Sequence, residues 1–138
     1  MKKKIAHIVS TTHWDREWYW PQEKYRIRLV DLIDSLIDIF KSKPEYKYYV
    51  LDGQVIALDD YLEIKQENQP IIESLIKSGK LWIGPWYVLP DVFLVSGESI
   101  IRNLLIGFNR SKQYGNVMKV GYLPDSFSHI DQIPQIMN

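Results

Sequence analysis

Apolar residues in this 138-residue chain fall into short, nearly continuous runs and longer stretches with helical spacing. The short runs lie at residues 4–11, 46–51, 80–84 and 118–123. Nearly continuous apolar runs of this length are typical of strands that are buried on both faces, as in parallel sheets. Polar residues and then a stretch with helical spacing follow each run, so the pattern predicts repeated strand–helix units.

Five helices are expected between and after these runs, over residues 21–43, 54–65, 68–78 and 96–114 and from residue 131 onward. Pro21 begins the first helix, where the missing N–H of proline loses no helical hydrogen bond. Ser96 is expected to cap the fourth helix, whose core side is formed by Ile100, Ile101, Leu104, Leu105 and Phe108. The order β-α-β-α-α-β-α-β-α predicts an α/β fold with a parallel sheet and right-handed crossovers.

Composition excludes several classes of protein. Seventeen basic residues balance seventeen acidic ones, so neither nucleic acid nor a membrane surface is an expected partner. The chain has no cysteine, which excludes disulfides and thiolate metal ligands. No apolar run approaches the ~18 residues of a membrane span. The basic start at residues 2–4 precedes an apolar run too short for a signal peptide, so a cytoplasmic location is expected.

The loops after the four predicted strands carry the candidate chemistry. Because parallel strands bring such loops to one edge of the sheet, their side chains are expected to share a site. The imidazole and carboxylate groups in these loops belong to His13, Asp15, Asp52, Asp91, Asp125 and His129. His7 lies inside the first run and is expected to be a buried, hydrogen-bonded core residue.

His13 and Asp15 are two residues apart, so in an extended segment both side chains can reach one cation. Imidazole with carboxylates suits zinc or a similar divalent ion. Asp91 has apolar neighbours, and a bound cation would compensate its burial. Simpler interpretations stay open: a capping Asp15 beside a satisfied histidine, an outward-facing Asp91, a plain turn at Asp52 before glycine, and an Asp125 that caps the last helix.

Aromatic residues accompany these polar groups. Trp14, Trp18 and Trp86 lie in the candidate loops, where an aromatic face could pack on the apolar face of a sugar ring. Trp82 alternates with apolar neighbours inside a predicted strand and is expected to be structural. Aromatic rings beside carboxylates are what a carbohydrate site needs, although most tryptophans in proteins are simply core residues.

Three motifs resemble glycoside hydrolase family 38, the α-mannosidases. They are residues 12–18 (THWDREW), residues 84–87 (GPWY) leading to Asp91, and residues 121–127 (GYLPDSF). The match is nearest to a bacterial cytoplasmic branch that includes mannosylglycerate hydrolase, which residues 48–54 also resemble. Residues 88–90 depart from that branch, so its particular substrate is not carried over, and Ser128 stands where glycine is expected.

The resemblance implies a distorted β/α barrel that binds one divalent cation, with zinc as the expected ion. His13, Asp15 and Asp91 match metal ligands, and Asp91 also matches the catalytic nucleophile of a reaction that retains configuration through a covalent mannosyl-enzyme. Trp18 matches an aromatic wall of the mannose pocket. The remaining residues expected to contact substrate are Trp86, Asp125 and Phe127.

The resemblance also implies missing parts, because the family's remaining metal-binding histidine and its acid/base carboxylate lie downstream of the matched region. A complete β/α barrel needs roughly 200–250 residues. Residues 1–138 are therefore expected to form a truncated N-terminal part of the catalytic domain, inactive alone. Its expected partners are an α-mannoside, the remainder of the enzyme chain and, through exposed edges, further copies of itself.

Two other functions remain open from the sequence. A metal-dependent carbohydrate deacetylase on a similar scaffold would need a water-activating base and more histidine ligands than His7, His13 and His129 supply. A non-catalytic carbohydrate-binding module would need only the aromatic and carboxylate groups.

Overall fold

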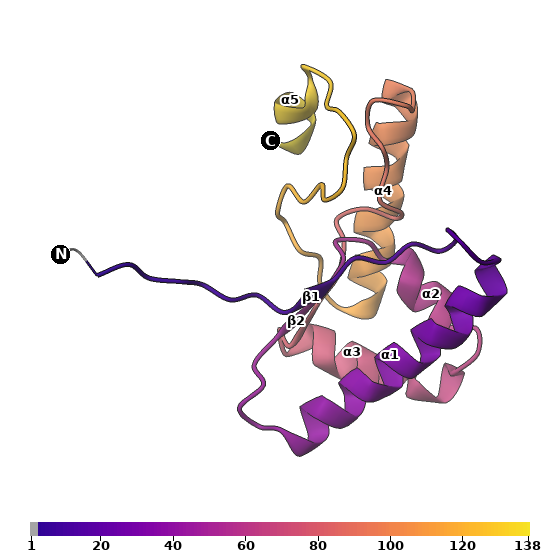
Figure 1. Cartoon of the computed structure of the whole chain (residues 1–138), viewed down its shortest axis with the longest axis vertical. Helices are drawn as coiled ribbons and strands as arrows, with labels where there is room; N and C mark the ends of the chain where they lie inside the picture. Colours follow the sequence, from indigo (N-terminus) through magenta and orange to yellow (C-terminus); the bar gives the residue numbers. More distant parts are fainter. Residues whose placement is uncertain (1–2) are drawn as a thin grey trace.

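A computed structural model of the chain describes residues 3–138; Met1 and Lys2, the latter part of the basic start, lie outside the described residues (Figure 1). Its elements in chain order are β1 (Thr11–Thr12), α1 (Gln22–Ser42), β2 (Tyr49–Leu51), α2 (Ile56–Leu62), the 3-10 turn η1 (Gln66–Asn68), α3 (Gln69–Lys77), β3 (Leu81–Trp82), α4 (Gly97–Tyr114) and α5 (Ile133–Met137).

Three short parallel strands form one sheet in the order β1-β2-β3. Thr12 pairs with Leu51, and Val50 pairs with Trp82, so β2 is the central strand. Its residues are all buried. The predicted α/β class with parallel strands is confirmed, and the three strands display only part of a barrel.

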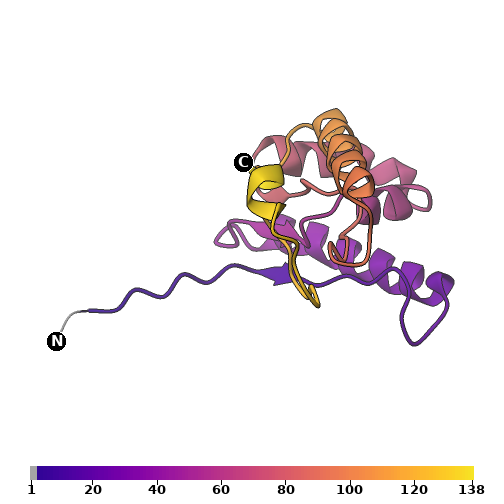
Figure 2. The same ribbon diagram turned by 90° about the horizontal axis from the view of Figure 1, so that it is seen from above.

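The first predicted strand, at residues 4–11, is wrong except at its end. Residues 3–10 extend away from the body of the molecule (Figures 1 and 2), and Ile5 and Ile8 are 81% and 84% exposed. An apolar run becomes a strand only where a neighbouring backbone supplies hydrogen bonds. Between residues 3–10 and the sheet, the one backbone hydrogen bond is that from Val50 N–H to Ser10 O, at 3.0 Å. His7 is exposed rather than buried, which corrects its expected core role.

The fourth predicted strand, at residues 118–123, is also wrong. Met118 N–H donates to Ile83 O at 2.9 Å, but the chain then leaves the sheet without forming a ladder, and Val120 is 56% exposed. Trp82 lies in β3 as predicted, yet 37% of its surface is exposed. The missing strand leaves that side of β3 open within residues 3–138.

Helices α1, α2 and α3 pack around β2 and form the main core. The buried residues of α1 recur at three- and four-residue steps, in line with the helical spacing of this stretch: Leu29, Ile33, Leu36, Ile37 and Phe40. Helix α2 is shorter than the predicted 54–65 because the chain turns at η1 before α3. No helix in the described part of the chain is both long and apolar enough to cross a membrane.

Helix α4 crosses directly over the loop that follows β3. Ser96 Oγ accepts a hydrogen bond from Ser99 N–H at 3.2 Å, which confirms the predicted cap. A Cβ at Gly107 would lie 2.2 Å from Pro85 O, so only glycine permits this close crossing. Ile101 and Leu105 are 47% and 59% exposed, which corrects their expected core position, because this face lines an open groove between α4 and α5.

Candidate active site

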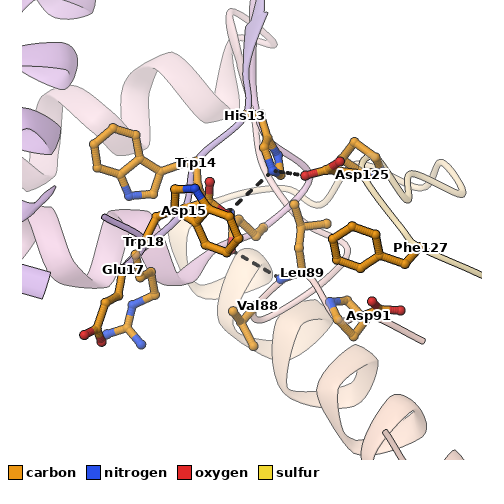
Figure 3. Close-up of a pocket in the computed structure, with 14 residues that line it drawn as sticks. His13, Trp14, Asp15, Glu17, Trp18, Val88, Leu89, Asp91, Asp125 and Phe127 are labelled. Atoms are coloured by element: carbon orange, nitrogen blue, oxygen red, sulfur yellow. Dashed lines mark hydrogen bonds and ion pairs between the residues drawn. The ribbon is translucent and has the colours of Figure 1, made fainter. Parts of the chain in front are cut away.

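One cavity of about 680 Å³ opens between the loop after β1, the loop after β3 and residues 124–127 (Figure 3). Six of the seven predicted site residues line it: His13, Asp15, Trp18, Asp91, Asp125 and Phe127. His129 is exposed and does not line the cavity. The carboxyl ends of β1 and β3 thus bring His13 and Asp91 into one cavity, as expected for such folds, and residues 124–127 complete it without a preceding strand.

Three carboxylates surround the His13 ring. Nδ1 lies 3.2 Å from Asp52 Oδ2, while Nε2 lies 3.7 Å from Asp15 Oδ1 and 3.4 Å from Asp125 Oδ2. Burial alone would lower the pKa of His13, but the Asp52 hydrogen bond and the charges of all three carboxylates raise it above its usual value. This corner of the cavity therefore favours a positive charge.

Asp52 is the buried support of that histidine. The residue is fully buried, and its φ of +47° lies in the left-handed region. Its carboxylate accepts hydrogen bonds from Trp14 N–H at 2.6 Å, Gln54 Nε2 at 3.0 Å and His13 Nδ1 at 3.3 Å. Burial raises the pKa of Asp52, and these bonds oppose the rise by stabilising the charged form.

The plain turn expected at Asp52 is therefore an incomplete description. The turn exists, with Gly53 at φ +63°, but the side chain points inward to the neighbouring loop. The sequence feature that could have indicated this role is the position of Asp52 directly after β2, the strand that pairs with β1. A side chain at that place lies beside the residues that follow β1.

Arg16 fixes the tryptophan-rich loop to α2. Its guanidinium donates to both oxygens of Asp60, from Nε at 2.7 Å and from Nη2 at 2.9 Å. Asp60 is only 6% exposed, and paired donors in this geometry give a strong and directional contact. Sequence reasoning missed this pair because Asp60 lies in the middle of α2, away from any loop motif.

Asp91 lines the cavity, and one of its carboxylate oxygens is unsatisfied. Its Oδ1 accepts a weak hydrogen bond from Phe93 N–H at 3.4 Å, and its buried Oδ2 has no partner. Helix α4 holds the preceding segment: Asn103 Oδ1 accepts from Tyr87 N–H at 2.9 Å and from Val88 N–H at 3.1 Å. Because an unpaired buried carboxylate oxygen is costly, the site suits a ligand that would satisfy it.

The structure does not bring His13, Asp15 and Asp91 to one point. Within residues 3–138, no three histidine or acidic side chains converge closely enough to hold a metal ion. Figure 3 shows Asp91 apart from His13 in the cavity, while Asp15 and Asp125 approach the imidazole. In donor type and charge the set fits a divalent cation, since it offers an imidazole nitrogen, carboxylates and the unpartnered Asp91 Oδ2.

The aromatic predictions divide into two outcomes. Trp18 and Phe127 line the cavity and are 63% and 82% exposed, so their rings are free to contact a ligand. Trp86 is a correction: its ring is fully buried against Val92 and Ile100 and cannot touch a substrate. Its Nε1–H donates to Tyr122 O at 2.7 Å, so Trp86 serves the core as a packing residue with a satisfied donor.

Fold and cavity together define an α/β chain of the kind that builds β/α-barrel enzymes, with an imidazole, carboxylates and aromatic rings at one end of parallel strands. The family model of the glycosyl hydrolases family 38 N-terminal domain matches residues 3–138, and the chain belongs to this family. The family predicted from the three sequence motifs is confirmed.

Named relatives agree with this assignment. A Halalkalibacterium halodurans protein named "Putative mannosylglycerate hydrolase" is 44% identical over 136 residues, covering 98% of this chain and 15% of that protein. An alpha-mannosidase of Saccharomyces cerevisiae is 29% identical, covering 93% of this chain and 12% of its own length. The crystal structure of an alpha-mannosidase from Enterococcus faecalis V583 matches with a TM-score of 0.91 at 46% identity, covering 94% of this chain and 15% of that one. The chain thus spans at most 15% of each relative.

Proposed function

We propose that this chain forms the N-terminal part of the catalytic domain of an enzyme that hydrolyses α-mannosides with retention of configuration. Family membership supports the reaction class, and two of the relatives above carry the name alpha-mannosidase. The observation that carries the proposal is the cavity, where the loop of His13 and the loop of Asp91 face each other beside exposed aromatic rings.

Asp91 is the nucleophile in this proposal. Its carboxylate attacks the anomeric carbon, the glycosidic C–O bond breaks, and the departing oxygen takes a proton from an acid residue supplied by the rest of the enzyme. Water then attacks the same carbon, returns a proton to that residue and releases mannose from Asp91. Asp91 lines the cavity, and its Oδ2 has no hydrogen-bond partner within residues 3–138 that a substrate would have to displace, which supports the role.

Other cavity residues would bind and orient the sugar. Trp18 and Phe127 offer exposed rings for its apolar face, and Asp125 offers a carboxylate, 69% exposed, for its hydroxyl groups. His13, Asp15 and Asp91 would hold one divalent cation, with zinc as the expected ion. Such an ion, when bound, orients hydroxyl groups of the substrate. The 138-residue chain alone is proposed to be inactive, and the cytoplasmic location stays a prediction from the sequence.

Replacing the nucleophile tests the proposal. In the full-length enzyme, Asp91→Asn should lower the turnover of an aryl α-mannoside on the order of 10⁴-fold, since the covalent step is lost. The matched control is Asp131→Asn, which makes the same change at an exposed residue outside the cavity and should leave turnover unchanged. Steady-state kinetics and titration calorimetry with mannose give the two readouts.

The outcomes separate the candidate functions. Loss of turnover with mannose still bound supports a mannosidase with Asp91 as nucleophile. Mannose binding by a wild-type enzyme that hydrolyses no α-mannoside would instead indicate a carbohydrate-binding module. Release of acetate from an acetylated sugar by the wild-type enzyme would indicate a deacetylase.

A further inference from the structure

A buried glutamine joins the two loops that carry the proposed site residues. Gln54 is 1% exposed and lies at the inner wall of the cavity. Its Nε2 donates to Trp14 O at 2.8 Å and to Asp52 Oδ2 at 3.0 Å, while its Oε1 accepts from Leu89 N–H at 3.3 Å. One amide group therefore links the segment after β1, the turn after β2 and the segment before Asp91.

Gln54 and Asp52 together fix the backbone between two proposed metal ligands. Trp14 stands between His13 and Asp15, and its N–H donates to Asp52 at 2.6 Å while its carbonyl accepts from Gln54. The backbone N–H and the backbone carbonyl of Trp14 are thus both held by buried side chains. The direction in which the neighbouring side chains leave the backbone is set at the same time.

Asp52 also selects the nitrogen that His13 offers to the cavity. Because Nδ1 donates to Asp52, Nε2 is the nitrogen that faces Asp15 and Asp125. A carboxylate behind a histidine in this way fixes the tautomer and the orientation of the ring in metal sites. Gln54 in turn holds that carboxylate through its Nε2.

The other end of Gln54 reaches the Asp91 loop two residues before the proposed nucleophile. Leu89 N–H is held by Gln54, while Asn103 of α4 holds Tyr87 and Val88 from the opposite side. The loop is therefore clamped between α4 and Gln54. Backbone hydrogen bonds of residues 53–56 with Trp86 and Tyr87 hold the same segment, and the Gln54 amide adds the side-chain link from this segment to the His13 loop.

We propose that Gln54 is a positioning residue that sets the spacing between the His13–Asp15 loop and the Asp91 loop, and so the affinity of the site for its divalent cation. This inference rests on the proposed function above. A glutamine is suited to the position because it donates to a carbonyl and a carboxylate at one end and accepts from an N–H at the other. Glutamate cannot replace it, since a second carboxylate would face Asp52 Oδ2 across 3.0 Å.

The test uses the full-length enzyme stripped of metal, with Zn²⁺ and Co²⁺ as probes. Gln54→Glu reverses the donor end, and Gln54→Met removes both hydrogen-bonding ends without adding charge. The control Gln66→Glu makes the first change on the exposed η1 turn. Zn²⁺ affinity is measured by titration calorimetry, the Co²⁺ absorption spectrum reports coordination geometry, and thermal unfolding reports stability.

Both Gln54 variants should bind Zn²⁺ about 10- to 100-fold more weakly and give an altered Co²⁺ spectrum, as expected when a residue that supports metal ligands is lost. The Gln66→Glu variant should match the wild type. Gln54→Met provides the measurement if Gln54→Glu does not fold.

A lowered unfolding temperature with unchanged Zn²⁺ affinity and Co²⁺ spectrum would assign Gln54 a structural role only and overturn the inference. Failure of the proposed function looks different: the wild-type enzyme itself would bind no Zn²⁺ and hydrolyse no α-mannoside. A wild-type enzyme that does both, with Gln54 variants equal to it, would overturn the positioning role alone.

Discussion

Asp52 and Asp125 lie beside opposite nitrogens of the His13 imidazole, Asp52 at Nδ1 and Asp125 at Nε2. Both have positive φ values, +47° and +54°, and both follow a segment predicted to be a strand. Asp52 is fully buried and accepts three hydrogen bonds, whereas the Asp125 side chain is 69% exposed and, among the described residues, forms an ion pair with His13 alone.

The difference originates in the backbone behind each residue. Asp52 follows β2, which is paired on both sides, so its carboxylate enters a region that is already closed. Asp125 follows residues 118–123, which form no strand, so its carboxylate remains at the cavity mouth. Two aspartates beside one histidine thus have different roles. Asp52, after the paired strand β2, is a rigid support for His13, and Asp125, after an unpaired segment, is an accessible hydrogen-bond acceptor.

The largest effect is expected for Asp52→Ala. Removing the carboxylate leaves the N–H of Trp14 and the Gln54 amide without their acceptor in a buried region and deprives His13 of its support. We expect the free energy of unfolding to fall by about 3–5 kcal/mol. Urea denaturation of the full-length enzyme, followed by tryptophan fluorescence, measures the change. A loss below about 1 kcal/mol would contradict the rigid support assigned to Asp52.

The same substitution at the other aspartate should affect function rather than stability. We expect Asp125→Ala to change the free energy of unfolding by less than about 0.5 kcal/mol, because the side chain is mostly exposed. Its kcat/KM for an aryl α-mannoside should fall about 10- to 100-fold through a lost hydrogen bond to the sugar. Urea denaturation and steady-state kinetics on the same preparation test the stability and the activity predictions. Equal losses of stability in Asp52→Ala and Asp125→Ala would contradict the difference in role between the two aspartates.

Local signals in the sequence predicted the helices, whereas the strands needed partners that the sequence does not specify. Pro21, Ser96 and the periodicity of α1 act within a few residues, and each prediction holds. The apolar runs at 4–11 and 118–123 meet the condition for a strand, but hydrogen bonding to a neighbour decides the outcome. The runs that found such a neighbour, β2 and β3, are strands.

The candidate site shows the same division. The rule that loops meet at the carboxyl ends of parallel strands placed His13, Asp15 and Asp91 in one cavity. Gln54 was missed because its role depends on its burial between two loops. That burial follows from how the strands pair in the folded chain, which the sequence does not specify. Trp86 was misassigned because a loop tryptophan that packs inward has the same sequence signature as one that faces a ligand.

The smallest expected effect concerns the open side of the molecule. Apolar side chains of α4 and α5 line an open groove, and the isolated 138-residue chain should cover this groove by self-association. Leu105 on α4 is 59% exposed, so Leu105→Glu should weaken association about tenfold, corresponding to about 1.4 kcal/mol. Ile64→Glu is the matched control, since Ile64 is 49% exposed between α2 and η1, outside the groove that Leu105 lines. Sedimentation velocity measures both, and a monomeric wild-type chain would mean that this groove needs no partner.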